Sequence, residues 1–168
     1  PANFLKWTEN EELKVALNLH PASGIQPYEA VYDDFTKEYG LSEKGKSVPF
    51  KIDERKWADA YFKTVLEPME RDGVDFWWLD WQQWKESKYT PGLSNTFWLN
   101  HTFFNHAERQ NPGLRPFIYH RWGGLGSHRY PLAFSGDTYA TWPMLAYLPY
   151  FTATASNVNY GWWGHDIG

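Results

Sequence analysis

Three aspartates share one setting in this sequence, and together they offer the chemistry of paired carboxylates. Asp80, Asp137 and Asp166 each follow an aromatic run that has the composition of a strand. A carboxylate directly after a buried strand is costly unless it is hydrogen-bonded or functional. In a parallel sheet, the carboxyl ends of the strands meet at one edge, so these side chains are expected to converge. Two converging carboxylates can act as nucleophile and general acid in the cleavage of a glycosidic bond.

The ordinary alternative is that each aspartate caps a helix or lies in a loop. For one aspartate alone, that alternative is the better explanation. Three aspartates in the same context, in a chain that also places Arg121 and Arg129 near them in sequence, favour a functional interpretation. Asp80 is the leading candidate, because the most apolar run of the chain ends on it.

Histidines at or near the predicted strand ends suggest a second kind of chemistry, a divalent metal site that would include Asp166. These histidines are His20, His120, His128 and His165. No pair of them has a close ligand spacing such as HxH or HExxH. We therefore predict neither a metal nor any other cofactor.

The central element that must position Asp80 is the stretch 73–84, GVDFWWLDWQQW. Residues 74–79 form a nearly unbroken apolar run, which predicts a strand buried on both faces. Further strands are predicted at about 13–20, 115–121, 130–135 and 158–163.

Helices are predicted between most of these strands. Their ranges are Tyr28–Tyr39, Asp53–Arg71 with Asp53 as the N-cap, Asn95–Gln110 and Thr141–Phe151, while 41–50 is predicted to be a surface loop. Strands that alternate with helices, and that carry polar residues at their carboxyl ends, predict an α/β fold with a parallel sheet.

Size and charge set limits on the class of protein. The chain has 168 residues, about one domain, whereas a complete α/β barrel needs about 250. The net charge of −4 gives no reason to expect nucleic acid or an anionic membrane as a partner. The sequence has no cysteine, which excludes disulfides and leaves the compartment open. No apolar run approaches the roughly 20 residues of a membrane span.

Aromatic residues are unusually abundant, with 11 Trp, 11 Tyr and 11 Phe. Tyr and Trp have an apolar face and a polar edge, so they suit a half-solvated cleft that binds sugar rings. A bulky core accounts for many of them as well, and composition alone does not choose between the two.

Three motifs occur in a fixed order that resembles glycoside hydrolase family 31. They are WWLDWQQ at 77–83, RWGGLGSHRYPLAFSGD at 121–137 and WGHDIG at 163–168. In that family, a W-x-D motif carries the nucleophile, an R…RY…SGD motif carries the acid/base, and G-x-D-I-G follows. The resemblance covers nearly the whole chain and implies Asp80 as nucleophile and Asp137 as acid/base.

The resemblance also implies which residues would hold the reacting sugar. They are Trp78, Arg121, Phe134 and Asp166. To this set we add His20, which ends the first predicted strand, and Trp81, which follows the nucleophile directly. Trp81-Gln82-Gln83 replaces the Met-Asn-Glu that is common in the family, so α-glucosides are only the default substrate.

Two family features are expected to lie outside this chain, namely a substrate-binding aspartate near the first barrel strand and a histidine after the last motif. Residues 1–168 are therefore predicted to be the central segment of a single catalytic (β/α)8 barrel domain, about strands three to seven. Flanking chain would supply the remainder of the barrel.

The function predicted from the sequence is a retaining α-glycoside hydrolase that acts on an oligosaccharide or α-glycoside through a covalent glycosyl-enzyme. No cofactor is required for this mechanism. Two alternatives stay open, a non-catalytic carbohydrate-binding domain and an inactive fragment of a barrel hydrolase.

Overall fold

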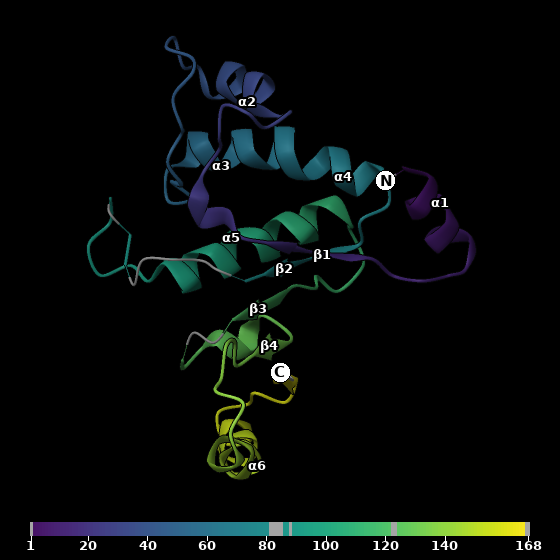
Figure 1. Ribbon diagram of the computed structural model, residues 1–168, viewed down its shortest axis with the longest axis vertical. Helices are drawn as coiled ribbons and strands as arrows, with labels where there is room; N and C mark the ends of the chain where they lie inside the picture. Colours follow the sequence, from purple (N-terminus) through teal and green to yellow (C-terminus); the bar gives the residue numbers. More distant parts are fainter. Residues whose placement is uncertain (1, 81–85, 88, 122–123, 167–168) are drawn as a thin grey trace.

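Five parallel strands form one sheet, in a computed structural model that describes residues 2–80, 86–87, 89–121 and 124–166 (Figure 1). The strands are β1 (Ala16–Leu19), β2 (Phe76–Leu79), β3 (Tyr119–Arg121), β4 (Ala133–Phe134) and β5 (Trp163–Gly164). Their order in the sheet is their order in the chain. A sheet wound in one direction in this way is an arc of a barrel, whereas a doubly wound sheet reverses its order at a switch point. The predicted α/β fold with parallel strands is confirmed.

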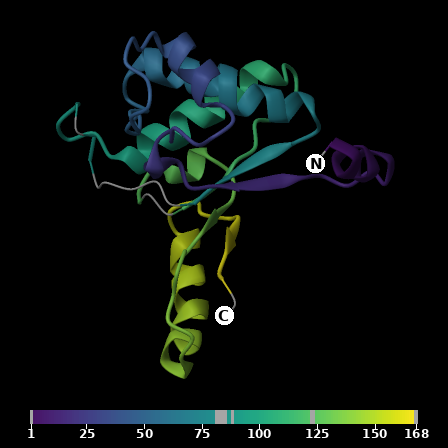
Figure 2. The same cartoon turned by 45° about the horizontal axis from the view of Figure 1, so that its top comes forward.

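Most of the helices gather on one part of the molecule, while the first and last helices each stand apart (Figure 1). Their bounds are α1 (Ala2–Asn10), α2 (Tyr32–Tyr39), α3 (Arg55–Tyr61), α4 (Glu67–Arg71), α5 (Asn95–Gln110) and α6 (Trp142–Ser156), with short helical segments η1 (Pro21–Ser23), η2 (Phe62–Leu66) and η3 (Ser127–Arg129). Helices α2 to α5 lie together beside β1 and β2 (Figure 1), and α6 stands apart beside the C-terminal strands (Figure 2). No helix in the described ranges is long and apolar enough to cross a membrane.

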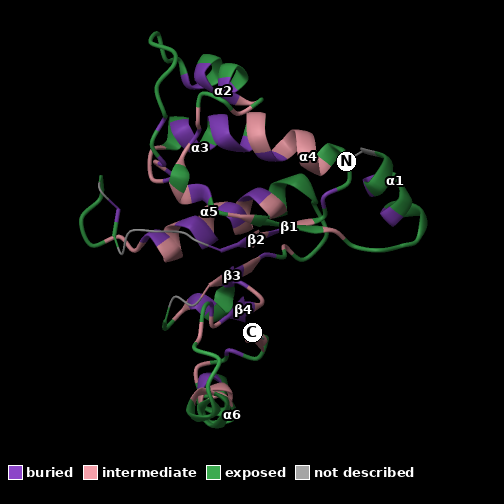
Figure 3. Ribbon diagram, in the orientation of Figure 1, coloured by how far each residue is buried: buried purple, intermediate pink, exposed green. Residues whose placement is uncertain are grey.

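The main core lies among α2 to α5 and is largely aromatic (Figure 3). Trp57 is fully buried at its centre. Its ring stacks on Tyr61 at 5.0 Å between centroids and meets the edges of Phe50 and Phe35 at 5.1 and 5.6 Å. Such aromatic pairs stabilise a core beyond their buried area. A good part of the aromatic excess is therefore core and is not available for a sugar cleft.

Strand β2 turns its side chains alternately to two different environments. Trp77 and Leu79 are buried on the helix-facing side, where the Trp77 indole donates a hydrogen bond of 2.7 Å to Glu70 of α4. Phe76 and Trp78 are only half-buried on the other side. The prediction of a strand buried on both faces is therefore wrong for the second face. Because side chains alternate along a strand, Asp80 follows Phe76 and Trp78 onto that half-open face.

The predicted helix Asp53–Arg71 is interrupted and begins later than expected. Glu54 occupies the N-cap position and makes no side-chain capping bond there, so Asp53 as the N-cap is wrong. Between α3 and α4, residues 62–66 form a π-helical turn in which the Glu67 N–H donates to the Phe62 carbonyl. Pro68 explains this turn, because proline has no N–H to donate and its ring clashes with the carbonyl four residues earlier.

Other helix predictions agree with the structure at least in part. Asn95–Gln110 is confirmed as α5 with the same bounds. Helix α2 begins later than the predicted Tyr28, and α6 runs on to Ser156, with Pro149 inside it. The N-terminal helix α1 has no counterpart among the predicted elements.

The predicted last strand, 158–163, is largely wrong. The chain turns after α6, and Asn159 has a left-handed φ of 65°, which is incompatible with an extended strand. Pairing with β4 begins only at Trp163. The loop 41–50 is also less superficial than predicted, because Val48 is buried and pairs with Ile25 in an antiparallel bridge.

We expect residues 1–168, expressed alone, to self-associate. The open strand order leaves β1 and β5 as edge strands with backbone groups available for pairing. Helix α6 adds exposed apolar surface, since Trp142 is 84% exposed and Tyr150 67% exposed. Size-exclusion chromatography with light scattering is expected to show oligomers, and charged replacements at Trp142, Leu145 and Tyr150 are expected to reduce them. A monodisperse 168-residue monomer that unfolds cooperatively would contradict this expectation.

Candidate active site

Asp80 lies at the centre of the site, directly after β2 and 8% exposed. The parallel register places Asn18 of β1 and Tyr119 of β3 on either side of Trp78. Two residues further along the chain in each case, His20 and Arg121 flank Asp80 itself. Side chains from three strands that are distant in sequence therefore meet at the carboxyl ends of the strands, as predicted from the polar strand endings.

Both carboxylate oxygens of Asp80 have partners. Arg121 contacts Oδ1 through Nε at 2.7 Å and through Nη2 at 2.6 Å. Asn18 donates from Nδ2 to Oδ2 at 3.1 Å, and His20 Nε2 lies 3.1 Å from the same oxygen. The side chains of Asp80 and Arg121 are each only 11% exposed, so this ion pair is largely shielded from water.

These contacts set the ionisation of Asp80. Burial by itself raises the pKa of the carboxyl, but the hydrogen bonds from Asn18 and Arg121, together with the charge of Arg121, outweigh burial. The net effect holds the pKa of Asp80 below its ordinary value of 3.8. Asp80 is therefore a carboxylate at neutral pH, which is the form that a nucleophile requires.

Arg121 also connects Asp80 to Asp137, the second predicted catalytic residue. Its Nη2 lies 2.6 Å from Asp80 Oδ1 and 3.7 Å from Asp137 Oδ1, so these two oxygens are at most 6.3 Å apart. The Asp137 side chain is 66% exposed, against 11% for Asp80. Two nearby carboxylates in such different surroundings are suited to different roles.

The turn that carries Asp137 depends on a glycine. Gly136 has a φ of +73°, a region that L side chains rarely adopt. A Cβ on Gly136 would also collide with the Arg121 guanidinium. Phe134, just before this turn, supports the same guanidinium, with its ring centroid 5.2 Å from Arg121 Cζ. Arg121 is thus packed between Phe134 and the Gly136 turn.

Replacing Gly136 with alanine is expected to lower kcat/KM by about a hundred-fold or more, because the added Cβ forces the Arg121 guanidinium, which contacts both carboxylates, to shift. Gly113→Ala is the matched control. Gly113 also has a positive φ, +92°, but an added Cβ there meets nothing within 4 Å. Kinetics on both variants, with melting temperatures, separate backbone strain from loss of the arginine. Equal activity in the two variants would contradict the role given to Gly136.

An aromatic wall adjoins the carboxylates on the half-open face of the sheet. Its rings belong to Trp78, Tyr119 and Phe134. The ring centroid of Trp78 lies 5.4 Å from that of Tyr119 and 5.4 Å from that of Phe134, and the last two are 4.8 Å apart. Tyr119 was not in the predicted site. Burial, and then the negative charges of Asp166 and Asp80, raise the pKa of its hydroxyl. The signal available in the sequence was its position two residues before Arg121, on the same side of β3.

The other predicted sugar contacts fall in different places. Asp166 acts electrostatically on Tyr119 together with Asp80, and it borders a smaller groove beside α6. His20 lies against Asp80. Trp81 lies outside the described residues. That these side chains contact the sugar is a prediction from the sequence.

The histidines considered for a metal site are dispersed. His120 is fully buried on the helix-facing side of β3, where its Nε2 lies 2.8 Å from the Tyr130 carbonyl and its Nδ1 lies 2.9 Å from Asn100 Nδ2. Burial lowers the pKa of His120. His165 instead contacts Ser135 and Thr152. Among the described residues, no group of three or more His, Asp or Glu could hold a metal ion.

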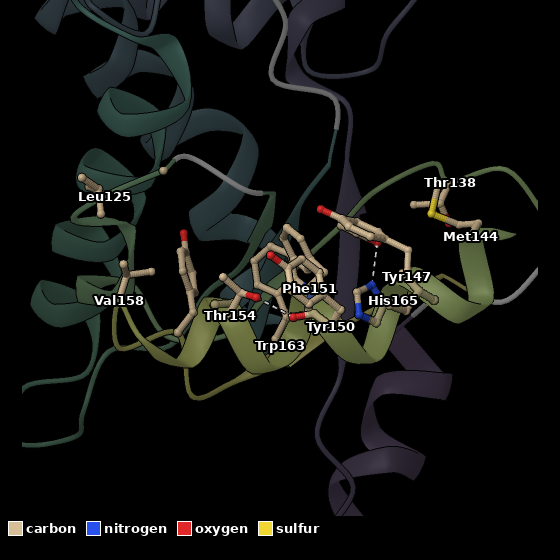
Figure 4. A pocket seen from close by; sticks show the side chains of 15 residues that line it. Leu125, Thr138, Met144, Tyr147, Tyr150, Phe151, Thr154, Val158, Trp163 and His165 are labelled. Atoms are coloured by element: carbon tan, nitrogen blue, oxygen red, sulfur yellow. Dashed lines mark hydrogen bonds between the residues drawn. The ribbon is translucent and has the colours of Figure 1, made fainter.

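A separate groove lies along α6 (Figure 4). It has a volume of about 740 Å³, and most of its lining is apolar. His165 also lines this groove, with Nδ1 3.1 Å from Ser135 Oγ and Nε2 3.0 Å from Thr152 Oγ1. Of the described residues, neither Asp80 nor Asp137 lines this groove. Its apolar lining is typical of a packing surface and differs from the polar site at Asp80.

The sequential parallel strands, with polar side chains gathered at their carboxyl ends, define a barrel domain of the class that builds active sites at that end. The profile described as "Glycosyl hydrolases family 31 TIM-barrel domain" matches residues 1–168, and the chain belongs to this family. The resemblance drawn from the three motifs is thereby confirmed.

Solved structures with a similar fold include a GH31 α-xylosidase from a soil metagenome complexed with xylose. It aligns with a TM-score of 0.72 at 17% sequence identity, over 100% of this chain and 28% of its own chain. At this identity the similarity concerns the fold alone. The chain thus spans little more than a quarter of the length of this structural relative. No curated protein matches the sequence.

Proposed function

We propose that this domain is the central part of a retaining α-glycoside hydrolase, with Asp80 as nucleophile and Asp137 as acid/base. The observation that carries this proposal is that Arg121 contacts both carboxylates at the strand ends. The upper limit of 6.3 Å between their facing oxygens, obtained from the 2.6 and 3.7 Å contacts, supports a retaining pair. Retaining carboxyls stand about 5–5.5 Å apart, whereas inverting carboxyls stand about 6.5–9.5 Å apart to admit a water.

The reaction proceeds in two displacements. In the first, a carboxylate oxygen of Asp80 bonds to the anomeric carbon while Asp137 gives its proton to the departing glycosidic oxygen. In the second, Asp137 takes a proton from water, the water oxygen bonds to the anomeric carbon, and Asp80 leaves as a carboxylate. Arg121 keeps Asp80 ionised and fixes its orientation. No cofactor takes part.

The partner is an oligosaccharide or a simpler α-glycoside, and flanking chain completes the barrel around it. An α-glucoside is the default sugar, and Trp81 in place of the family's methionine is the reason to test others. The half-buried rings of Trp78 and Tyr119 offer flat apolar faces beside the nucleophile, which suit the C–H faces of a sugar ring, and the fully buried Phe134 packs against both.

A panel of aryl α-glycosides, assayed on the full-length protein, tests both the activity and the sugar. We expect turnover of at least one α-glycoside, with the α-anomer of the sugar as the first product seen by NMR. A preference for α-xylosides or α-galactosides would replace the default sugar and keep the mechanism. A β-anomer as first product would overturn the retaining mechanism. Binding of sugars without turnover would favour a carbohydrate-binding domain.

A further inference from the structure

We propose that Asn18 is a positioning residue for the nucleophile, and that it directs Oδ2 of Asp80 toward the anomeric carbon. This inference rests on the proposed function and goes beyond it, because it concerns a residue of a neighbouring strand that no motif includes. Its basis is the unequal way in which the two oxygens of Asp80 are held.

Oδ1 is held by a cation. Two nitrogens of Arg121 reach it, at 2.7 and 2.6 Å, and the Arg121 side chain is only 11% exposed. The Nε contact is a charge-assisted hydrogen bond and the Nη2 contact is a close ion pair, so together they are costly to break during the reaction. Oδ1 is therefore held by Arg121, and Oδ2 is the oxygen better placed for attack.

Oδ2 has two weaker partners, Asn18 and His20, each at 3.1 Å. They differ in how they are anchored. Asn18 lies within β1 and pairs in register with Trp78, while the Asp80 N–H donates to the Leu19 carbonyl at 3.1 Å. The Asn18 amide is therefore held at a fixed place relative to Asp80. His20 follows the strand end, and its side chain is 55% exposed, so it can turn away when the sugar enters.

The amide of Asn18 has two chemical effects on Asp80. It fixes the rotation of the carboxylate, which aligns the remaining lone pair of Oδ2 with the anomeric carbon. It also stabilises the charged form of Asp80, which favours departure of the carboxylate when the ester is cleaved. Its loss should therefore slow both displacements, whatever the leaving group.

The test uses Asn18→Leu in the full-length protein, with the best aryl α-glycoside of the panel as substrate. We expect kcat/KM at neutral pH to fall about ten- to a hundred-fold, the size expected for a hydrogen bond to a charged group. The acidic limb of the kcat/KM profile should move to higher pH, because Asp80 loses a donor that favours its ionised form. Good and poor leaving groups should lose similar factors.

Two further variants of Asn18 and one control complete the design. Asn18→Asp should shift the acidic limb further than Asn18→Leu, because a second carboxylate disfavours ionisation of the first. Asn18→Ala adds no bulk and serves if the leucine variant does not fold. Asn105→Leu makes the same chemical change on α5, where the amide contacts His101, and should leave the profile unchanged.

A wild-type acidic limb in folded Asn18→Leu or Asn18→Ala, together with wild-type kcat/KM, would overturn this proposal. Asp80→Asn, assayed beside them, distinguishes failure of the positioning role from failure of the proposed function. If Asp80→Asn is inactive while the Asn18 variants behave as wild type, only the positioning role fails. If Asp80→Asn retains activity, the proposed function itself fails.

Discussion

Asp80→Asn is expected to abolish cleavage of every α-glycoside that the full-length protein hydrolyses. We expect kcat to fall by on the order of 10⁴-fold or more. Asparagine has nearly the same shape as aspartate, but its amide is uncharged and forms no glycosyl ester. The substitution also leaves the largely shielded guanidinium of Arg121 without its closest counter-charge. The loss should be the same for activated and natural substrates, because no step of the reaction bypasses the nucleophile.

The same strand offers a matched control for this substitution. Asp75 precedes β2 at the opposite end, where it accepts hydrogen bonds from Lys14 Nζ at 2.8 Å and from the Val15 N–H at 2.9 Å. Asp75→Asn makes the same chemical change far along the strand from the site and should retain activity close to wild type. Mass spectrometry under steady-state turnover should show a glycosyl adduct in the control and none in Asp80→Asn. Substantial turnover by Asp80→Asn would remove Asp80 from the mechanism.

Asp137→Ala is expected to give the second largest effect, and this effect should depend on the leaving group. Natural glycosides need protonation of the departing oxygen, so their cleavage should fall about 10²- to 10⁴-fold. An activated aryl glycoside needs little protonation, so its first displacement should survive. The second displacement lacks its base, and the glycosyl-enzyme should accumulate.

Azide provides the internal control for Asp137→Ala, because an anion attacks the glycosyl-enzyme without a general base. Added azide should restore turnover of the aryl glycoside and give the α-glycosyl azide as product. Wild-type enzyme should show little response to azide. If the variant is equally inactive on activated and natural substrates, and azide has no effect, the role given to Asp137 is wrong.

The parts of the fold that were predictable from sequence are those set by local signals. Helix α5 was predicted with its observed bounds because Asn111-Pro112-Gly113 is a strong stop signal. Asp80 was identified as the leading carboxylate because its apolar run is unmistakable. Both depend on residues that are neighbours in the chain.

The parts that could not be predicted depend on contacts between distant residues. The contact of Asn18 with Asp80 requires the parallel register of β1 with β2, which no local pattern in either strand specifies. The need for glycine at 136 comes from the Arg121 guanidinium, which belongs to another strand. The short β5 was misplaced because a left-handed Asn159 breaks a run whose composition favours a strand.

The position of Arg121 between two carboxylates has a consequence for the charge balance of the reaction. Before attack, under the proposed roles, Asp80 carries the negative charge and Asp137 carries the proton. After the first displacement Asp80 is a neutral ester and Asp137 is the carboxylate. The negative charge has then moved from the 2.6 Å contact of the guanidinium to its 3.7 Å contact, while the cation has stayed in place. The three groups, Asp80, Arg121 and Asp137, have a net charge of zero both before attack and in the glycosyl-enzyme. No unbalanced charge is therefore created beside a largely desolvated ion pair.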